Sequence, residues 1–200
     1  GVDPAAFAAI DIGLKRTGGD ALGTIGATQG KDLAAVIRMI AIHDSLTRTA
    51  TGWSTRSTSI DTDEIVEVYE ADPPEWQTCV SVQNQAKHWA KSVGLKLVSP
   101  SAIGAFAHLA HRAGHAPDDV VGFVEFVVKD ENHTAGNPAT SLRRWLAGTA
   151  LSRTGGVDHG LVVLSGWVRA FNATLGAEPL HKIYSWSRAS QTYPSVAGAA

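Results

Sequence analysis

Three histidines in one short stretch are the residues of this sequence best suited to metal chemistry. His108, His111 and His115 are spaced so that one continuous helix would place them on a single face. Three imidazoles on one face could hold a zinc ion and leave one position open for water. A clear fourth ligand is missing, and the candidate for it is Glu125 on the next predicted helix. Gly114, however, is expected to end the helix before His115, and histidines in a last turn complement the helix dipole without any ligand. We therefore expect no bound metal and keep the three histidines as candidates.

The other reactive side chains form no recognisable catalytic motif. Cys79, the only cysteine, falls on the apolar face of a predicted helix, where it is expected to pack in the core. The glycine pairs Gly18-Gly19 and Gly155-Gly156 lack the lysine and hydroxyl of a phosphate-binding loop. The acidic stretch Asp61–Glu64 begins a predicted helix, where negative charge complements the helix dipole. We expect no catalytic residue and no cofactor, and the sequence leaves an enzymatic role of this chain open while favouring a non-enzymatic one.

Basic side chains indicate a different kind of chemistry, the binding of phosphates. The chain has 17 Lys+Arg against 19 Asp+Glu and a formal charge of -2, which excludes a strongly basic surface but allows a local basic patch. Basic residues that share a face could contact DNA phosphates, whereas the alternative is a set of solvated faces. The predicted contacts are Lys15, Arg16, Arg38, Arg143 and Arg144, and further basic residues on or near neighbouring elements are Arg48, Arg56, Lys87, Lys91 and Lys96.

The elements that must position these residues are predicted to be helices. A small polar residue followed by proline recurs before apolar helical patterns, as expected where proline occupies the first helical position and its neighbour caps a free N–H. These signals are Asp3-Pro4, Asp72-Pro73, Ser99-Pro100 and Asn137-Pro138, with Ala116-Pro117 as a relative. The predicted helices are Asp3–Ile10, Thr17–Gly26, Asp32–Leu46, Asp61–Ala71, Pro73–Val93, Ser99–Ala113, Pro117–Lys129 and Pro138–Leu151.

The stretch Asp158–Leu175 is expected to lie at the centre of this bundle. Its apolar residues surround most of a helical wheel, so the helix must be buried on several sides. The sequence predicts an all-α fold, an irregular bundle of about eight or nine helices around this buried helix. Thr47–Ser59, rich in Thr, Ser and Gly, is predicted to be an exposed loop. No apolar run reaches membrane-spanning length, so we expect no membrane partner.

Several segments of the chain resemble one family of phage and bacterial proteins. The segments are GVDPAAFAAIDIGLKRTGGDAL, LVSPSAIGAFAHLA, GNPATSLRRWL, VLSGWVRAFNATLG and KIYSW. They are similar to the helical C-terminal region of proteins that carry an N-terminal ParB/sulfiredoxin-like domain. The resemblance implies linker helices over residues 1–30 after an upstream ParB-like domain, a helical domain over 31–186 and a loose tail over 187–200. The positions that it implies to be structural or interdomain are Asp11, Gly13, Arg16 and Asp20.

What the resemblance implies for function is a role in DNA transactions of a phage or mobile element. The expected function is non-catalytic, by contact with DNA or by support of the upstream ParB-like domain, in the cytoplasm of a bacterial host. The alternative is a protein-interaction module that forms homo-oligomers, with Trp53 and Trp186 as exposed anchors. A third hypothesis is a metal-dependent enzyme built on the histidine cluster.

Overall fold

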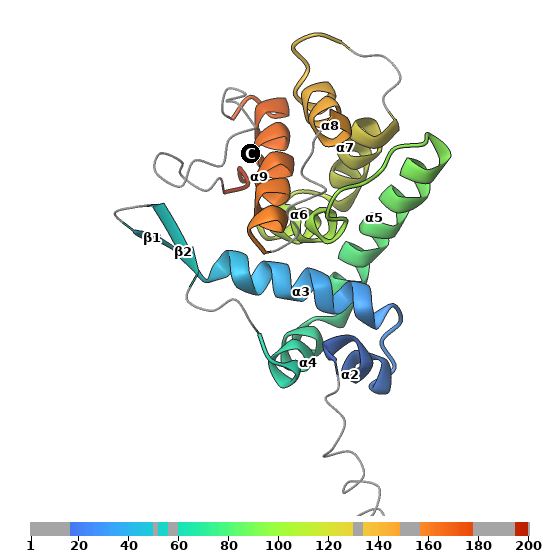
Figure 1. Cartoon of the computed structure of the whole chain (residues 1–200), viewed down its shortest axis with the longest axis vertical. Helices are drawn as coiled ribbons and strands as arrows, with labels where there is room; N and C mark the ends of the chain where they lie inside the picture. Colours follow the sequence, from blue (N-terminus) through green and yellow to red (C-terminus); the bar gives the residue numbers. More distant parts are fainter. Residues whose placement is uncertain are drawn as a thin grey trace, which may run out of the picture.

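The chain forms a bundle of helices with one short hairpin, seen in a computed structural model that describes residues 17–49, 52–55, 60–129, 134–148, 157–177 and 195–199 (Figure 1). Within these ranges the fold is all-α, as the sequence predicts. The helices are α2 Gly18–Thr24, α3 Gly30–Asp44, α4 Thr62–Ala71, α5 Pro73–Ser92, α6 Ser101–Arg112, α7 Pro117–Lys129, α8 Pro138–Gly148 and α9 Val157–Thr174. The predicted helix Asp3–Ile10 lies outside the described residues.

Polar caps fix several helix starts where the sequence places them. The Thr17 side chain accepts a hydrogen bond from the Asp20 N–H, and the Asp20 carboxylate accepts one from the Thr17 N–H, which closes a capping box. Asp61 and Glu64 make the same arrangement before α4. Asp72 caps α5 immediately before Pro73. Asp20 therefore has a structural role at the start of α2.

A two-stranded antiparallel hairpin follows α3. Strand β1, Leu46–Thr49, pairs with β2, Gly52–Thr55, in the register Leu46↔Thr55 to Thr49↔Gly52. The prediction of an irregular loop over Thr47–Ser59 is therefore wrong in this part. Both strands carry threonines, with Trp53 in β2, and such residues favour extended backbone. Two residues separate the strands, which is the commonest length of a hairpin connection.

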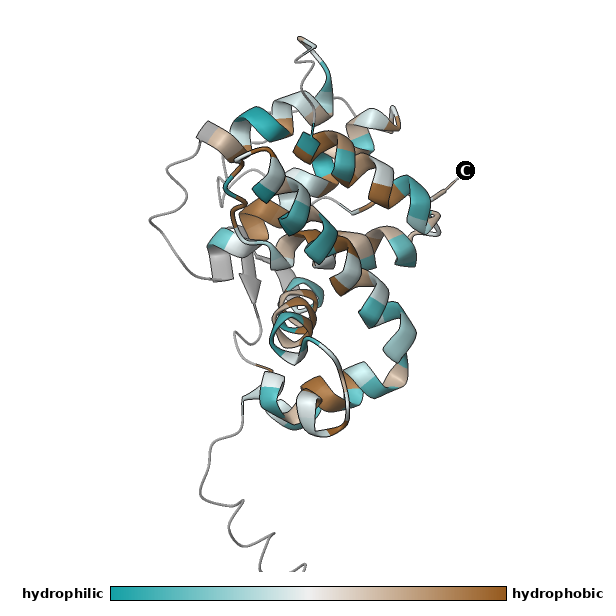
Figure 2. Ribbon diagram, turned by 90° about the vertical axis from the view of Figure 1, so that its right-hand side faces the viewer, coloured by the Kyte–Doolittle hydropathy of each residue, from teal (hydrophilic) through white to brown (hydrophobic). Residues whose placement is uncertain are grey.

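Helix α6 shares the centre of the bundle with α9. Residues 102–110 of α6 are all buried, and α6 packs against α3, α5, α7 and α9. Helix α9 packs against α6, α8 and α3, and residues 160–172 are buried except at two half-buried positions, which confirms that this helix is apolar nearly all round. Figure 2 shows brown, hydrophobic stretches on the helices of the bundle. The small side chains of its alanines, and the absence of one at Gly104, allow four other helices to pack closely around α6.

An aromatic cluster fills the space between α6, α7 and α9. The ring of Phe106 lies 5.8 Å from that of Phe123, 6.0 Å from that of Trp167 and 5.2 Å from that of Phe171, measured between centroids. Phe106 and Trp167 are 0% exposed. These tilted, stacked and edge-to-face contacts add to the free energy gained by burying the rings themselves.

The two ends of the described chain are attached to the bundle. Helix α2, which falls in the predicted linker over residues 1–30, packs against α3 and α4 and buries Leu22 completely. Residues 195–199, in the predicted loose tail, make hydrogen bonds to the body: the Asn172 side chain binds the Ser195 carbonyl and the Ala197 N–H at 2.8 and 3.0 Å. None of the described helices combines the length and apolar character that crossing a membrane requires.

Candidate functional site

The basic residues predicted to contact DNA do not form one patch in the part of the chain that the structure describes. Lys15 and Arg16 lie outside the described residues, as do Asp11 and Gly13. Arg143 donates hydrogen bonds to the carbonyls of Val127 and Val128 at the end of α7, so its guanidinium has a structural role. Arg144 is exposed on α8. Arg38 is exposed on α3 with its guanidinium beside Gly18 of α2, toward the other end of the molecule.

A different surface carries the polar side chains that suit phosphate binding. On α5, the buried face includes Trp76, Val80 and Ala86, and the opposite side is polar along its whole length. We name this side the α5 outer face. Its residues lie on one side of the helix because they follow the helical period, with Asn84 and Gln85 side by side in the sequence. They are Gln77, Ser81, Asn84, Gln85, His88 and Lys91. Lys91 is one of the further basic residues noted in the sequence, but the amide-rich face around it was not predicted.

The turn between α2 and α3 lies against this face and forms a groove with it. Thr28 donates a hydrogen bond to Gln77 at 3.2 Å, the Asn84 amide donates one to Gln29, and Lys87 contacts both carboxylate oxygens of Asp32 at 2.8 Å. The groove is lined by Gln29, Gln77, Ser81, Asn84, Gln85, His88 and Trp89. All of these side chains except Trp89 are polar, and none is acidic.

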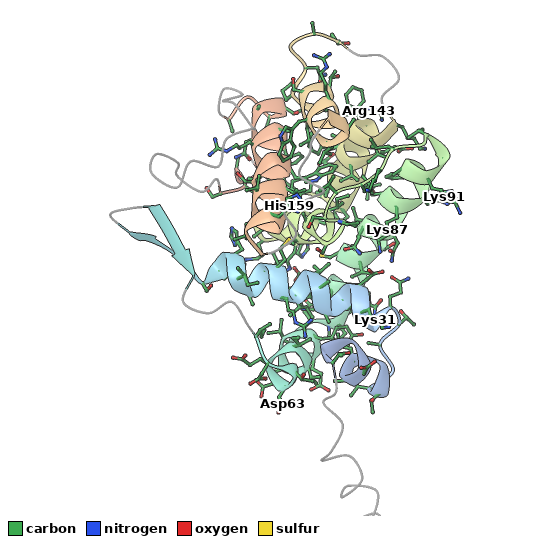
Figure 3. The ribbon with its side chains drawn as sticks, in the orientation of Figure 1. Lys31, Asp63, Lys87, Lys91, Arg143 and His159 are labelled. Carbon is green, nitrogen blue, oxygen red and sulfur yellow. The ribbon has the colours of Figure 1, made fainter. Side chains whose placement is uncertain are left out.

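Lysines surround the groove. Figure 3 shows Lys31, Lys87 and Lys91 along the same edge of the molecule, from the start of α3 and from α5. On the far side, the Lys129 ammonium lies 5.0 Å from the centroid of the Trp89 ring. Lys87 is paired with Asp32 and Lys129 with Glu125, whereas Lys31 and Lys91 are exposed, with Lys31 near the Asp20 carboxylate. Residues 76–117, which include nearly all of α5, contain no Asp or Glu. This surface therefore combines amides, positive charge and an aromatic ring.

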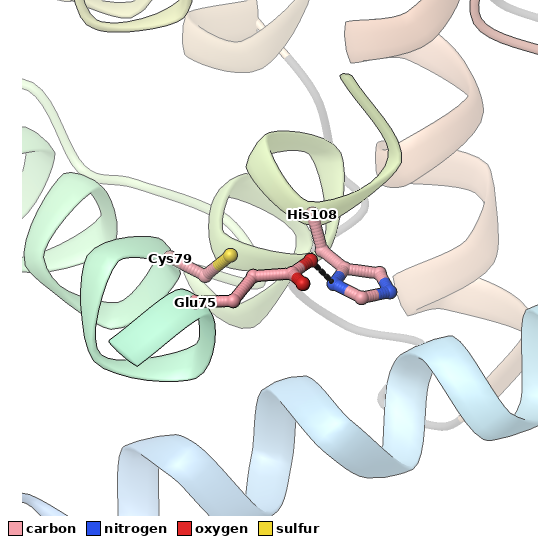
Figure 4. A group of neighbouring side chains, drawn as sticks. All are labelled: Glu75, Cys79 and His108. Atoms are coloured by element: carbon pink, nitrogen blue, oxygen red, sulfur yellow. Dashed lines mark ion pairs between the residues drawn. The ribbon is translucent and has the colours of Figure 1, made fainter. Parts of the chain in front are cut away.

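A second cluster, Glu75, Cys79 and His108, lies between α5 and α6 (Figure 4). Glu75 and Cys79 are four residues apart and so share one face of α5, and His108 reaches them from α6. Their ligand atoms lie within 4.8 Å of one another, and no other such group occurs among the described residues. His108 Nδ1 lies 2.5 Å from Glu75 Oε1, and the imidazole stacks on Trp76 with centroids 4.3 Å apart.

Burial governs the protonation of this cluster. It lowers the pKa of His108, although the Glu75 carboxylate acts in the opposite direction. Burial, together with the negative charge of Glu75, raises the pKa of the Cys79 thiol to about 12. At neutral pH the imidazole is therefore uncharged and the thiol keeps its proton. Cys79 is 2% exposed, in agreement with its predicted place in the core.

The structure separates the three histidines that the sequence placed together. Gly114, with φ +88°, follows the end of α6 and turns the chain, so that His115 leaves the helix. The buried His115 contacts the Ala197 carbonyl and lies edge-on to Phe171, and His111 is exposed. Glu125 pairs with Lys129 at 2.5 Å rather than with a histidine. Only His108 belongs to the cluster of ligand atoms, and its partners come from α5.

No family model, no curated protein and no solved structure matches this chain. The resemblance to proteins with a ParB-like domain therefore stays a prediction from the sequence.

Proposed function

We propose that this chain is a non-catalytic DNA-binding helical protein that contacts duplex DNA through the α5 outer face. The observation that carries the proposal is the groove along α5, lined by amides, a hydroxyl, His88 and Trp89 and surrounded by lysines. No acidic side chain interrupts residues 76–117, and Asp32 of α3, which lies beside α5, is paired with Lys87, so repulsion of a phosphate backbone is reduced there.

The dimensions of α5 suit a duplex. A helix of 20 residues is about 30 Å long, close to one turn of B-DNA. Lys31 and Lys91, which are exposed, supply charge for phosphates, and hydroxyl and amide groups such as Ser81 and Gln85 are common phosphate and base-edge contacts. The similarity to phage proteins with an upstream ParB-like domain supports the same class of function.

Reversing the two exposed lysines should weaken DNA binding. For Lys31→Glu combined with Lys91→Glu, we expect an affinity for a short labelled duplex reduced by about 10-fold, because two phosphate contacts are lost. The slope of log K against log salt should fall by about 2, one unit for each contact. Fluorescence anisotropy over a series of salt concentrations measures both quantities.

Arg38→Glu is the matched control for this experiment. It changes charge at an exposed position of α3, but its guanidinium lies beside Gly18 and not at the groove. We expect its affinity and salt slope to equal those of the wild type. An equal loss in both variants, or no binding by the wild type at low salt, would contradict the proposal. Stronger binding to RNA than to duplex DNA would show that the α5 outer face binds RNA instead.

A second candidate function is self-association through an apolar groove between α7, α8 and α9. Phe126 and Leu175 are large apolar side chains, 45% and 48% exposed, and both line this groove. Of the two tryptophans predicted as anchors, Trp186 and the side chain of Trp53 lie outside the described part of the chain. Exposed apolar side chains that share one groove are typical of protein-interaction surfaces.

Sedimentation velocity tests this alternative. If the groove joins two copies, the wild type should sediment as a dimer at high concentration, and Phe126→Ser with Leu175→Ser should sediment as a monomer. Ser81→Ala, at an exposed position of α5, should leave the dimer unchanged. A wild type that stays monomeric at every concentration would exclude self-association through this groove.

A further inference from the structure

We propose that Glu75, Cys79 and His108 form a binding site for a zinc ion between α5 and α6. The donor set is one carboxylate oxygen, one thiolate sulfur and one imidazole nitrogen, and all three are ligands that zinc takes in proteins. This inference is independent of DNA binding, since the cluster does not line the groove of the α5 outer face.

The helix pair itself brings the donors together. Glu75 and Cys79 are one helical turn apart on α5, so their side chains project from the same face. Helix α6 packs closely on α5 at Gly104, which has no side chain. A Cβ atom at this position would lie 3.4 Å from the Cys79 carbonyl oxygen. His108, one turn further along α6, therefore projects toward Glu75 (Figure 4). Stacking on Trp76 fixes the plane of the imidazole.

Two buried polar atoms in the cluster lack a suitable hydrogen bond. Glu75 Oε1 and His108 Nδ1 are both fully buried, and although they lie 2.5 Å apart their approach lacks the alignment of a hydrogen bond. His108 as a whole is 7% exposed. Leaving buried polar atoms unsatisfied is unfavourable, and a cation held between them would satisfy both.

The spacing of the donors fits a small ion after a slight side-chain adjustment. With metal–ligand distances of about 2.0–2.3 Å, neighbouring donors in a tetrahedral zinc site lie roughly 3.4–3.6 Å apart. Here the donor atoms all lie within 4.8 Å, with the carboxylate and imidazole at 2.5 Å. Binding therefore requires the Glu75 and Cys79 side chains to rotate, so that the carboxylate and imidazole separate and the sulfur approaches them.

The donor types select the metal, and a neighbouring pocket supplies the remaining ligand. Thiolate and imidazole favour zinc over magnesium or calcium, which prefer oxygen donors. A pocket of about 90 Å³ is lined by Glu75 and Cys79 together with His111 and His115, so water in it can take the fourth position. On binding, the Cys79 thiol releases its proton to solvent and the thiolate sulfur bonds to the ion. Thiolate and carboxylate then balance its two positive charges.

Cobalt is the probe that distinguishes this site from surface histidines. Titrating Co²⁺ into the purified full chain should give a single equivalent with visible d–d bands of tetrahedral intensity and a near-ultraviolet sulfur-to-cobalt charge-transfer band. Added Zn²⁺ should remove these bands by competition. Cys79→Ser should abolish the charge-transfer band, and Cys79→Ser or His108→Gln should weaken affinity by about 100-fold or more, since a direct ligand is lost.

His88→Gln is the matched control, because His88 is exposed on α5 outside the cluster. Its cobalt spectrum and affinity should equal those of the wild type. Circular dichroism of each variant shows whether the helices persist, and Glu75→Gln provides a further ligand variant if Cys79→Ser does not fold. A folded wild type without stoichiometric cobalt or zinc binding, or one whose binding survives both Cys79→Ser and His108→Gln, would overturn the proposal and leave only a buried contact between Glu75 and His108.

Discussion

Replacing Phe106 by alanine should lower the free energy of unfolding by about 4 kcal/mol, because a large ring is removed from a closely packed interior. Phe106 is 0% exposed on α6 and contacts the rings of Phe123, Trp167 and Phe171. The substitution leaves a cavity between three helices that cannot all move inward. Urea denaturation followed by circular dichroism measures the change.

Phe126→Ala is the control for this prediction. It deletes the same ring from α7, but Phe126 is 45% exposed. We expect a loss below about 1 kcal/mol, as for most exposed positions. Equal losses for the two variants, measured at a low protein concentration, would show that α6 is not at the centre of the bundle.

Gly104→Ala and Gly122→Ala should change stability in opposite directions. Both glycines lie inside helices, where alanine is intrinsically favoured by about 1 kcal/mol. A Cβ atom at Gly104 would lie 2.6 Å from a methyl carbon of Val36 and 3.2 Å from the Gln83 side-chain oxygen, whereas one at Gly122 meets nothing within 4 Å. We expect Gly104→Ala to destabilise by about 2 kcal/mol through overpacking and Gly122→Ala to stabilise by about 0.5–1 kcal/mol.

Thermal and urea unfolding of the two glycine variants provide the measurement. Val36 is buried and β-branched, so it has little freedom to move away from an added methyl group. Stabilisation by both substitutions would mean that α3 and α6 are further apart than the structure places them.

Local sequence signals predicted most of the helices because their causes are local. Thr17 and Asp61 act as caps through backbone N–H groups only three residues away, and Pro73 begins α5 directly after its cap. The apolar pattern around Trp167 likewise requires burial wherever the helix lies. The hairpin was missed because neither short strand shows a long alternating pattern, and pairing between strands decides their structure.

The candidate sites depend on tertiary contacts and were harder to predict. The spacing of Glu75 and Cys79 places them on one helical face, but nothing in the sequence shows that His108 of α6 packs against them. The histidine spacing suggested a cluster within one helix, which the turn at Gly114 prevents. Arg143, predicted to contact DNA, instead binds carbonyl oxygens at the end of α7.

One signal for the α5 outer face was present in the sequence. Residues 76–117 contain no acidic side chain, and Gln77, Ser81, Gln85 and His88 follow a helical period within them. The formal charge of the whole chain is -2, and this total does not reveal that one long segment lacks acidic side chains. A local count of charge along each predicted helix would have placed the proposed DNA contacts on α5.

A titration of the ¹⁵N-labelled chain with a short DNA duplex, followed by two-dimensional NMR, tests DNA binding by α5 most directly. We predict that backbone amides of Gln77, Ser81, Gln85, His88 and Lys91 shift together with a common dissociation constant, and that added salt reverses the shifts. Shifts concentrated on α8 around Arg144, or no shifts at low salt, would contradict the proposed function.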